Sequence, residues 1–355
     1  AGGTGGHVFP ALATARLLQR EGIDVHWIGT RKGIEAEVIP DADIPISFID
    51  VSGLRGNGMA NLIRAPFQLM KALLQAIHCL REIRPQGVLG MGGFVTGPAG
   101  LAAWLLRIPL LIHEQNAVAG LTNNLLSRLS QRVLAAFPGV FEKINKGAGD
   151  LVVTGNPVRT DIASIPEPGE RMANREGTLR LLVLGGSLGA QVLNEMVPEA
   201  ISKFEMVERP EVIHQAGKRN YETAKQNYEK IAVTAEVKPF IDDMAGAYEW
   251  ADLVICRSGA LTVSEISIAG VAAVFIPYPH AVDDHQTKNA EYLEDAGAAV
   301  IVQQRNLDSQ RLANLLKGLM ADREALKEMA VKARSMAKPK ATETVVKQIL
   351  EVCYA

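Results

Sequence analysis

Short apolar runs alternate with longer amphipathic stretches along the sequence. The runs typical of buried strands are Val25–Ile28, Gly87–Leu89, Leu110–His113, Val133–Ala135, Leu151–Thr154, Leu179–Leu184, Leu253–Cys256 and Ala273–Ile276. Between them, stretches such as Asn61–Arg84 and Ala190–Lys203 place apolar residues three and four positions apart, as amphipathic helices do. This alternation predicts an α/β fold built of βαβ units, with parallel sheets covered by helices on both faces.

The pattern starts afresh in the middle of the chain, which predicts two domains. Gly155–Arg159 is followed by a polar segment, and a new strand, glycine loop and helix begin at Leu179. We expect Rossmann-like domains over residues 1–157 and 158–335, and a C-terminal helix within 336–355 that packs back on the first domain. A glycine loop like the one that opens the sequence normally follows a buried strand, so we expect the first domain to lack its first strand.

Composition and charge exclude several classes of function. Hydrophobic residues make up 48% and charged residues 21% of the 355, as in ordinary globular proteins. The net charge of -2 gives no basis for binding nucleic acid. Cys79, Cys256 and Cys353 lie far apart, which disfavours a disulfide framework and a zinc site. No apolar run is long enough to span a bilayer, so we expect any membrane contact to be at the surface.

Three glycine-rich loops, at 2–7, 90–94 and 185–190, stand where a predicted strand gives way to a helix. Glycine allows backbone amides to approach an anion closely, and the start of a helix adds favourable partial charge. One such loop can serve packing alone, but three together favour binding of phosphate groups on two ligands. The first loop is not a clean G-x-G-x-x-G, and Glu35 and Glu37 lie beyond the expected spacing of about 20 residues, which disfavours NAD.

Two polar segments of the C-terminal half have the chemistry of a nucleotide-sugar site. Arg257–Glu265 follows a predicted strand, so its amides suit a diphosphate, and Glu265 suits the paired hydroxyls of a ribose. The alternative is a solvated helix glutamate. Further on, Asp283–Asn289 has neighbouring aspartates but no D-x-D pair, so we expect no metal site there. His285 and Gln286 better match the hydroxyls of a sugar.

Taken together and in order, these motifs resemble one enzyme family. They are Gly2–His7, His113–Asn116, Gly155–Arg159, Gly185–Ser187 and Cys256–Glu265. Over essentially its whole length the chain is similar to the bacterial lipid II-forming glycosyltransferases. These enzymes transfer N-acetylglucosamine from UDP-N-acetylglucosamine to undecaprenyl-pyrophosphoryl-MurNAc-pentapeptide (lipid I) in peptidoglycan synthesis. The resemblance implies a GT-B fold, two Rossmann-like domains facing a central cleft, with no cofactor, at the cytoplasmic face of the cell membrane.

The resemblance also implies roles for individual residues. Ile241 would contact uracil through its backbone, and Glu265 would bind the ribose. The residues implied in binding UDP-N-acetylglucosamine are Thr4, Gly5, Gly6, Asn116, Arg159, Ser187, Ile241, Ala260, Leu261, Thr262, Val263, Ser264, Glu265 and Gln286. Those implied in binding the acceptor are Gly92, Gly93, Phe94 and His113. Phe94 stands where members often have tyrosine, and His285 stands where some have glutamine.

The family's reaction converts an α-glycoside into a β(1→4) link, which implies one inverting displacement. The acceptor's 4-hydroxyl must lose a proton, and His7 is the candidate base because the dipole at a helix start disfavours the imidazolium form. The alternative is that His7 only binds phosphate or caps its loop. Glu114 is the second candidate base, unless it merely orients its loop. Without a metal, Arg159, Arg257 and helix-start amides would stabilise the departing UDP.

An amphipathic stretch predicts contact with an anionic lipid surface. Its apolar residues are Ile63, Phe67, Leu69, Met70, Leu73, Leu74 and Ile77, near the basic residues Arg55, Arg64, Lys71, Arg81 and Arg84. The alternative is that the stripe packs in an ordinary core.

Two other functions fit the same architecture. A UDP-N-acetylglucosamine 2-epimerase would need acid and base carboxylates around C2 of the sugar, whereas this chain has two glycine loops in its N-terminal half. A non-catalytic nucleotide-sugar-binding subunit would not need complete motifs in both halves. The transferase therefore remains the preferred prediction.

Overall fold

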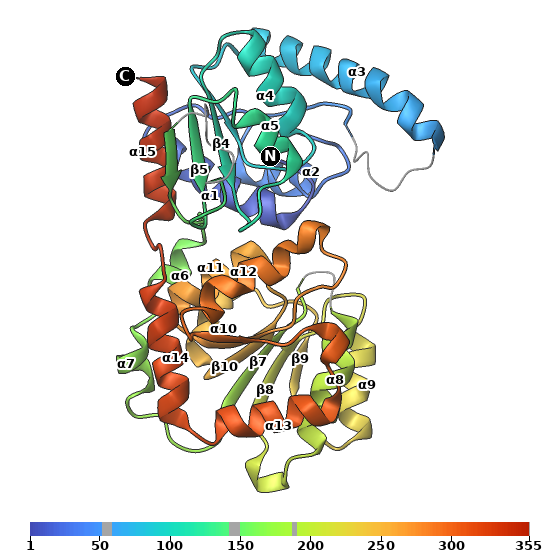
Figure 1. Cartoon of the computed structure of the whole chain (residues 1–355), viewed down its shortest axis with the longest axis vertical. Coiled ribbons are helices and arrows are strands. Elements are labelled where there is room, and N and C mark those ends of the chain that lie inside the picture. Colours follow the sequence, from blue (N-terminus) through green and yellow to red (C-terminus); the bar gives the residue numbers. More distant parts are fainter. Residues whose placement is uncertain (52–58, 142–149, 187–189, 355) are drawn as a thin grey trace. The chain divides into compact units, whose positions relative to one another are not determined.

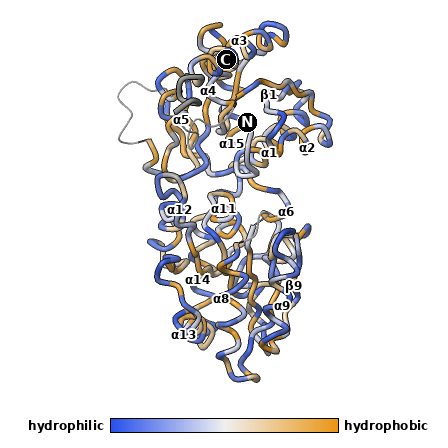
Figure 2. The backbone as a smooth tube through the Cα atoms, turned by 90° about the vertical axis from the view of Figure 1, so that its right-hand side faces the viewer, coloured by the Kyte–Doolittle hydropathy of each residue, from blue (hydrophilic) through white to orange (hydrophobic). Residues whose placement is uncertain are grey.

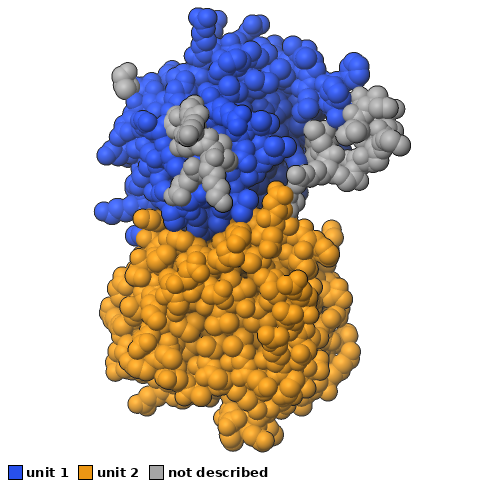
Figure 3. Space-filling model, viewed as in Figure 1, with its two compact units in different colours: residues 1–158, 339–355 blue, residues 159–338 orange. Residues whose placement is uncertain are grey.

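The computed structural model describes the whole chain except residues 52–58, 142–149, 187–189 and 355, and only the backbone of residues 59–64 and of Val282. The chain divides into two units, shown in separate colours in Figure 3. Unit 1 contains residues Ala1–Val158 and Pro339–Ala355, and unit 2 contains Arg159–Lys338. The predicted boundary was after residue 157.

Unit 1 is built around a four-stranded parallel sheet in the order β3-β4-β5-β6 (Figure 1). Its strands are β3 (Val88–Gly90), β4 (Leu110–Glu114), β5 (Arg132–Ala135) and β6 (Asp150–Val153). Helices α1 (Gly5–Arg20), α3 (Met59–Ile83), α4 (Thr96–Leu105), α5 (Leu121–Leu126) and α15 (Ala341–Cys353) surround it. A shorter helix, α2 (Glu35–Val38), and a 3-10 turn, η1 (Pro40–Ala42), follow β1.

Helices cover both faces of this sheet. Leu110 and Ile112 of β4 pack in a cluster with residues of α3 and α4, whereas Leu111 packs with Leu18 of α1 and with α15. Because successive side chains of a strand point to opposite faces, a strand buried on both sides must be apolar throughout. This explains the uninterrupted apolar run from which β4 was predicted.

Strands β1 (Trp27–Gly29) and β2 (Ile46–Phe48) form a separate two-stranded parallel sheet in unit 1. A cavity of about 900 Å³ is lined by residues of β1, β3, α1 and α15, among them Ile28, Leu89, Ala15 and Ile349. The expectation that the first domain lacks a strand stays a prediction.

Unit 2 contains a six-stranded parallel sheet in the order β12-β11-β10-β7-β8-β9. The strands are β7 (Arg180–Leu184), β8 (Glu211–Gln215), β9 (Glu236–Lys238), β10 (Leu253–Cys256), β11 (Ala272–Phe275) and β12 (Ala299–Ile301). The longer helices are α8 (Gln191–Ser202), α9 (Tyr221–Lys230), α10 (Met244–Trp250), α11 (Ala260–Ala269), α12 (His285–Glu294), α13 (Ser309–Met320) and α14 (Arg323–Ser335). Short helical segments are α6 (Thr160–Ala163), α7 (Pro168–Met172), η2 (Met206–Glu208), η3 (Val282–Asp284) and η4 (Gln304–Asn306).

The core of unit 2 lies between its sheet and its amphipathic helices. Leu181 and Val183 of β7 pack with Leu193 of α8 and Leu312 of α13, all nearly or fully buried. Figure 2 shows the alternation of hydrophobic and hydrophilic positions along these helices. The carboxyl ends of the parallel strands meet at one edge of the sheet, where ligands of such folds bind.

The predicted strands all overlap observed ones, and the two stretches given as amphipathic helices correspond to α3 and α8. Four strands were not predicted: β2, β8, β9 and β12. β9 lies at the edge of its sheet and has the sequence Glu-Val-Lys, so it lacks the apolar run of an interior strand.

Candidate functional site

The first two glycine loops lie against each other in unit 1. Gly92 and Gly93 have φ of +82° and +80°, a region that favours glycine. A Cβ on Gly93 would overlap the carbonyl of Gly2, and a Cβ on Gly92 would overlap the imidazole of His7, 2.8 Å from its Nε2. Glycine is therefore required at both positions by backbone conformation and by the closeness of the loop at 2–7.

His7 lies in the first turn of α1, with its ring held between the two loops. Its Nδ1 is 3.3 Å from the hydroxyl oxygen of Thr4, and its Nε2 end lies over Gly92. The side chain is half-buried, and Gly5 and Gly6 form the helix start beside it. The structure thus brings Thr4, His7 and Gly92, all predicted site residues, into one group.

Glu114 ends β4, and its buried carboxylate binds its own loop. Oε1 accepts hydrogen bonds from the backbone N–H of Asn116 (3.0 Å) and from the Asn116 amide (3.2 Å). Oε2 accepts from the N–H of Gly120 (3.1 Å) and from the amide of Asn123 (2.8 Å). Because the side chain is only 3% exposed, this geometry favours the loop-orienting role over that of a base.

His113, predicted to bind the acceptor, is fully buried. Its Nε2 lies 3.0 Å from the carbonyl oxygen of Gly155, and its Nδ1 lies 3.2 Å from the amide nitrogen of Gln115. Burial lowers the pKa of His113 to about 4, partly opposed by the bond to Gly155, so the ring is neutral at pH 7. The buried ring contacts the loops that carry Gln115 and Gly155, and the acceptor role of His113 stays a prediction.

Gln115 was not singled out from the sequence, although it connects the end of β4 to the loop at 90–94. Its amide nitrogen donates to the carbonyl of Met91 (3.2 Å) as well as facing His113. Its Oε1 is buried without a hydrogen bond among the described residues, and lies 3.2 Å from the position of a Cβ on Gly92. The loop after β4 is thereby fastened to the loop at 90–94, whose Phe94 is exposed.

Glu35 is a second residue that the sequence did not identify in this role. Its fully buried Oε2 accepts from the N–H of Gly3 (2.9 Å), and its Oε1 accepts from the N–H and hydroxyl of Thr30, both at 2.8 Å. Burial acts to raise the pKa of Glu35, but the hydrogen bonds from Gly3, Thr30 and its own N–H outweigh it and lower that pKa. The ionised carboxylate supports the first glycine loop.

The second group lies in unit 2, where α11 begins at Ala260 directly after the turn that follows β10. The first amides of a helix have no partner within the helix and attract anions. Ser264 donates its hydroxyl to the carbonyl of Ala260 (2.9 Å), so that hydroxyl serves the helix. Leu261, Thr262 and Val263 complete the first turn.

Glu265 lies on α11, one turn further on, and is partly buried. Its Oε2 accepts a hydrogen bond of 3.1 Å from the hydroxyl of Tyr248 on α10. Burial raises the pKa of Glu265 to about 7, while the Tyr248 bond and the charge of Arg159 oppose this rise. This partly buried, hydrogen-bonded carboxylate differs from the solvated helix glutamate that was the alternative above.

Arg159 joins the start of α6 to the segment after β9. Its guanidinium contacts both carboxylate oxygens of Asp161, at 3.3 and 2.7 Å, and donates to the carbonyl of Asp242 at 3.2 Å. Hydrogen bonding to Asp161 is the main reason that the pKa of Arg159 is raised. Ile241, with its side chain buried, directly precedes Asp242. The structure thus brings together Arg159, Ile241 and Glu265, whereas Ser187 lies outside the described residues.

Two polar side chains follow the neighbouring strand β11. Gln286 accepts a hydrogen bond from the N–H of Tyr278 (2.9 Å), so its amide nitrogen is the end suited to a ligand. Arg257 donates to the carbonyls of Ile276 (2.9 Å) and Pro277 (3.1 Å), and its guanidinium lies over the Tyr278 ring. The guanidinium of Arg257 therefore holds this loop, which differs from the predicted role at a phosphate.

No group of three or more His, Cys, Asp or Glu side chains that could hold a metal ion occurs within the described residues. Nor does any described helix have the length and apolarity needed to cross a membrane.

Comparison with known proteins shows where the chain belongs. Residues 1–135 match the glycosyltransferase family 28 N-terminal domain, and residues 180–345 match its C-terminal domain. A protein of Marinobacter nauticus named UDP-N-acetylglucosamine–N-acetylmuramyl-(pentapeptide) pyrophosphoryl-undecaprenol N-acetylglucosamine transferase is 57% identical over 354 residues, which are 99% of this chain and 96% of that protein. The chain belongs to this transferase family.

Other comparisons agree with this family. The Alkalilimnicola ehrlichii member is 53% identical over 351 residues, 99% of this chain and 97% of its own. The crystal structure of Acinetobacter baumannii MurG has a TM-score of 0.85 at 46% identity, covering 99% of this chain and 97% of that one. The predicted family and two-domain GT-B fold are confirmed.

The 2-epimerase is not favoured for this member of the transferase family. The structure of UDP-GlcNAc 2-epimerase from Neisseria meningitidis has a TM-score of 0.67 at only 14% identity, covering 98% of each chain. Such a likeness shows a common fold alone.

Proposed function

We propose that this chain transfers N-acetylglucosamine from UDP-N-acetylglucosamine to the 4-hydroxyl of the muramoyl residue of lipid I, which yields lipid II for peptidoglycan synthesis. The observation that carries the proposal is the group in unit 2: Glu265 accepts a hydrogen bond from Tyr248, and it lies on the same helix as the first turn of α11, which begins at Ala260. This arrangement provides acceptors for ribose hydroxyls and amides for a diphosphate, in a chain that belongs to the transferase family.

Donor binding is assigned to the predicted residues of unit 2. Glu265 accepts hydrogen bonds from the ribose, and the backbone of Ile241 contacts uracil. The amides of Ala260–Ser264 and the Arg159 guanidinium stabilise the diphosphate, whose charge increases as the sugar departs. Gln286 offers its amide nitrogen to the sugar. Thr4, Gly5, Gly6 and Asn116 of unit 1 complete the proposed set.

His7 is the proposed base for the acceptor's 4-hydroxyl. Its ring is oriented by Thr4 at one nitrogen and by Gly92 beneath the other, which leaves the imidazole partly accessible. Glu114 is unsuited to this role because its carboxylate already accepts four hydrogen bonds. The amides of Gly92 and Gly93 are proposed to bind the acceptor's pyrophosphate, with exposed Phe94 beside them.

The outer surface of α3, α4 and α5 is proposed to dock on the cytoplasmic face of the cell membrane. The predicted stripe on α3 divides: Leu73 and Ile77 pack against the core, whereas Phe67, Met70 and Leu74 are exposed. The lipid-facing patch, as we define it, comprises Phe67, Met70, Leu74, Trp104, Leu105, Leu121 and Leu125, which are between 48% and 77% exposed.

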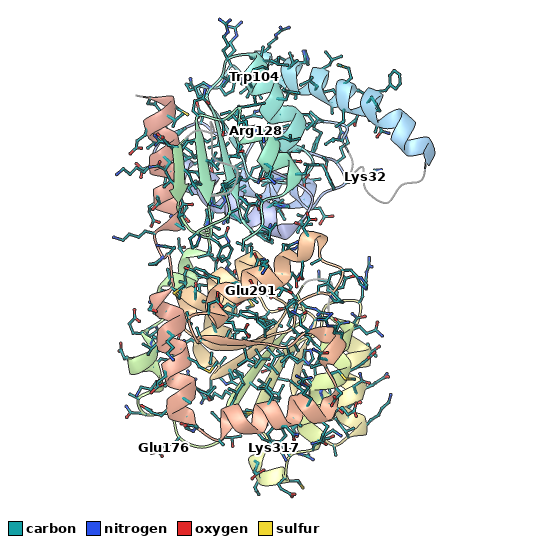
Figure 4. The ribbon with its side chains drawn as sticks, in the orientation of Figure 1. Lys32, Trp104, Arg128, Glu176, Glu291 and Lys317 are labelled. Atoms are coloured by element: carbon teal, nitrogen blue, oxygen red, sulfur yellow. The ribbon has the colours of Figure 1, made fainter. Side chains whose placement is uncertain are left out.

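Exposed apolar residues gathered on adjoining helices are typical of interaction surfaces. α4 packs on both α3 and α5, and Trp104 of α4 and Arg128 are both labelled in Figure 4. Exposed Arg107 and Arg128 supply positive charge for anionic headgroups.

The experiment that tests the function is turnover of labelled UDP-N-acetylglucosamine with a lipid I analogue, next to a donor-only reaction. We expect UDP release that depends on the acceptor, together with a β-linked disaccharide. Release of N-acetylmannosamine from the donor alone would instead identify an epimerase. Donor binding without transfer to any acceptor analogue would identify a nucleotide-sugar-binding subunit.

A further inference from the structure

Tyr248 lies on α10, seventeen residues before its partner, and nothing in the sequence motifs points to it. Its side chain is fully buried, and its hydroxyl donates to Oε2 of Glu265 at 3.1 Å. A buried hydroxyl requires a hydrogen-bond partner, and this one has a carboxylate. The pair therefore connects the buried side of α10 to the side of α11 on which donor binding is proposed.

The hydroxyl of Tyr248 is a permanent donor. Burial, followed by the negative charge of Glu265, raises its pKa well above that of an ordinary tyrosine, so the phenol stays protonated through the neutral range. In the part of the chain that the structure describes, Oε1 of Glu265 has no hydrogen bond, so it is the oxygen left for a ligand.

We propose that Tyr248 is a positioning residue for donor recognition: its hydroxyl donates to Oε2 of Glu265 and so holds that carboxylate in the ionised form that accepts the ribose hydroxyls. The inference rests on the proposed donor role of Glu265. It adds a residue that does not touch the donor but sets the affinity and the pH dependence of donor binding.

Several ionisable groups face Glu265 from the elements packed around it. Arg159 and Asp161 come from the start of α6, Tyr248 from α10 and Cys256 from the end of β10. Arg159 favours the ionised carboxylate and Asp161 opposes it. Burial raises the pKa of Cys256 above the neutral range, and Glu265 adds to this rise, so the thiol carries no charge there.

Charged side chains from other helices contact α11 away from Glu265. Arg334 of α14 binds the carbonyl of Ile268, and Arg171 of α7 binds the carbonyl of Ala269 (2.9 Å), both at the far end of α11. From α12, the neutral amide of Asn289 donates to the carbonyl of Ser258 (3.1 Å). Tyr248 is thus the direct hydrogen-bond donor to Glu265 among the described residues.

The sign of the pH effect follows from the pKa of about 7 for Glu265. Ribose hydroxyls donate to the ionised carboxylate of Glu265. Below pH 7 most of this carboxyl group is protonated, so it must lose its proton before the donor can bind. Affinity for UDP-N-acetylglucosamine should fall about tenfold between pH 8 and pH 6. The phenol of Tyr248 stabilises the ionised form of Glu265. Without it, we expect the midpoint of the pH dependence of donor affinity to rise by about one pH unit.

The experiment measures the Kd of UDP-N-acetylglucosamine by calorimetry from pH 6 to pH 9. Its diphosphate is esterified at both ends and does not titrate in this range. Relative to the unchanged chain, Tyr248→Phe should bind about ninefold more weakly at pH 6, about threefold at pH 7.5 and almost equally at pH 9. The matched control is Tyr228→Phe, which removes another buried hydroxyl of unit 2, one bonded to His214 at 2.9 Å. It should leave the curve unchanged.

Glu265→Gln separates the inference from the function on which it rests. This variant should bind UDP-N-acetylglucosamine weakly, and its affinity should not change around pH 7. Adding Tyr248→Phe to it should not weaken binding further. If Tyr248→Phe weakens binding by one factor at every pH, or leaves it unchanged while Glu265→Gln is impaired, the positioning role is wrong. Wild-type affinity in Glu265→Gln would refute the donor role of Glu265 itself, and the positioning role with it.

Discussion

Glu35 provides a sharp test of how the first glycine loop is held. In Glu35→Gln, one carboxylate oxygen becomes an NH₂ group. If the amide oxygen keeps the two bonds from Thr30, the NH₂ group faces the N–H of Gly3, and both are donors. A lost hydrogen bond to a charged group, with a buried donor left unpaired, should reduce the free energy of unfolding by about 2–3 kcal/mol. The melting temperature should then fall by roughly 5–10 °C.

The assay combines thermal unfolding with hydrogen exchange in the peptides that contain Gly3 and Thr30. The matched control is Glu37→Gln, two residues along the same helix but exposed. We expect faster exchange of the Gly3 amide in Glu35→Gln only, with exchange of the Thr30 amide unchanged, and reduced turnover because the loop that carries His7 is held less firmly. Equal melting and equal exchange in the two variants would refute the reasoning.

Comparing the unchanged chain with Glu35→Gln also tests how the stability of the fold depends on acid. The pKa of Glu35 is lowered below the ordinary value of 4.5, so the native state binds fewer protons here than the unfolded state does. This group therefore stabilises the fold above pH 4.5, and its contribution is lost as the pH falls through its folded pKa. The stability difference between the unchanged chain and Glu35→Gln should narrow in acid, and a constant difference down to pH 3 would contradict the lowered pKa.

Three further predictions concern the other parts of the proposed site. His7→Ala should reduce turnover by about 10²–10⁴-fold with donor Kd unchanged, and a near-normal rate would exclude it as the base. Gly92→Ala should lower both melting temperature and turnover, because it combines a φ of +82° with a clash against His7. Gly139→Ala has a similar φ of +80° in open space, so it should show the backbone strain of about 1–3 kcal/mol alone. Phe67→Ser should weaken sedimentation with anionic vesicles without changing turnover of a soluble acceptor analogue. Val207→Ser, at a residue of unit 2 that is 93% exposed, should not weaken sedimentation. Equal sedimentation of the two variants would refute the lipid-facing patch.

The sequence by itself determined the elements whose signal is local. An apolar run such as Leu110–Ile112 is typical of a strand buried on both faces, and a strand was predicted where β4 lies. The glycine loops could also be predicted from the sequence. A positive φ or a close backbone approach suits glycine but not other residues. The order of these motifs was also sufficient to identify the family.

Only the tertiary structure decided which polar side chains face a ligand and which face the protein. His113 and Glu114 stand in the same motif as Asn116, yet both are buried and hydrogen-bonded within unit 1. Their chemistry is fixed by residue type, but their burial and partners depend on how β4 packs between helices. Sequence spacing carries no such information.

The partners of Glu35 and Glu265 show the same limit. Glu35 supports Gly3 from 32 residues away, and Tyr248 reaches Glu265 across seventeen residues from another helix. Each carboxylate could be recognised from the sequence as an ionisable group on a helix. Its pKa could not, because the surrounding protein sets that value, and distant segments become surroundings only when the chain folds.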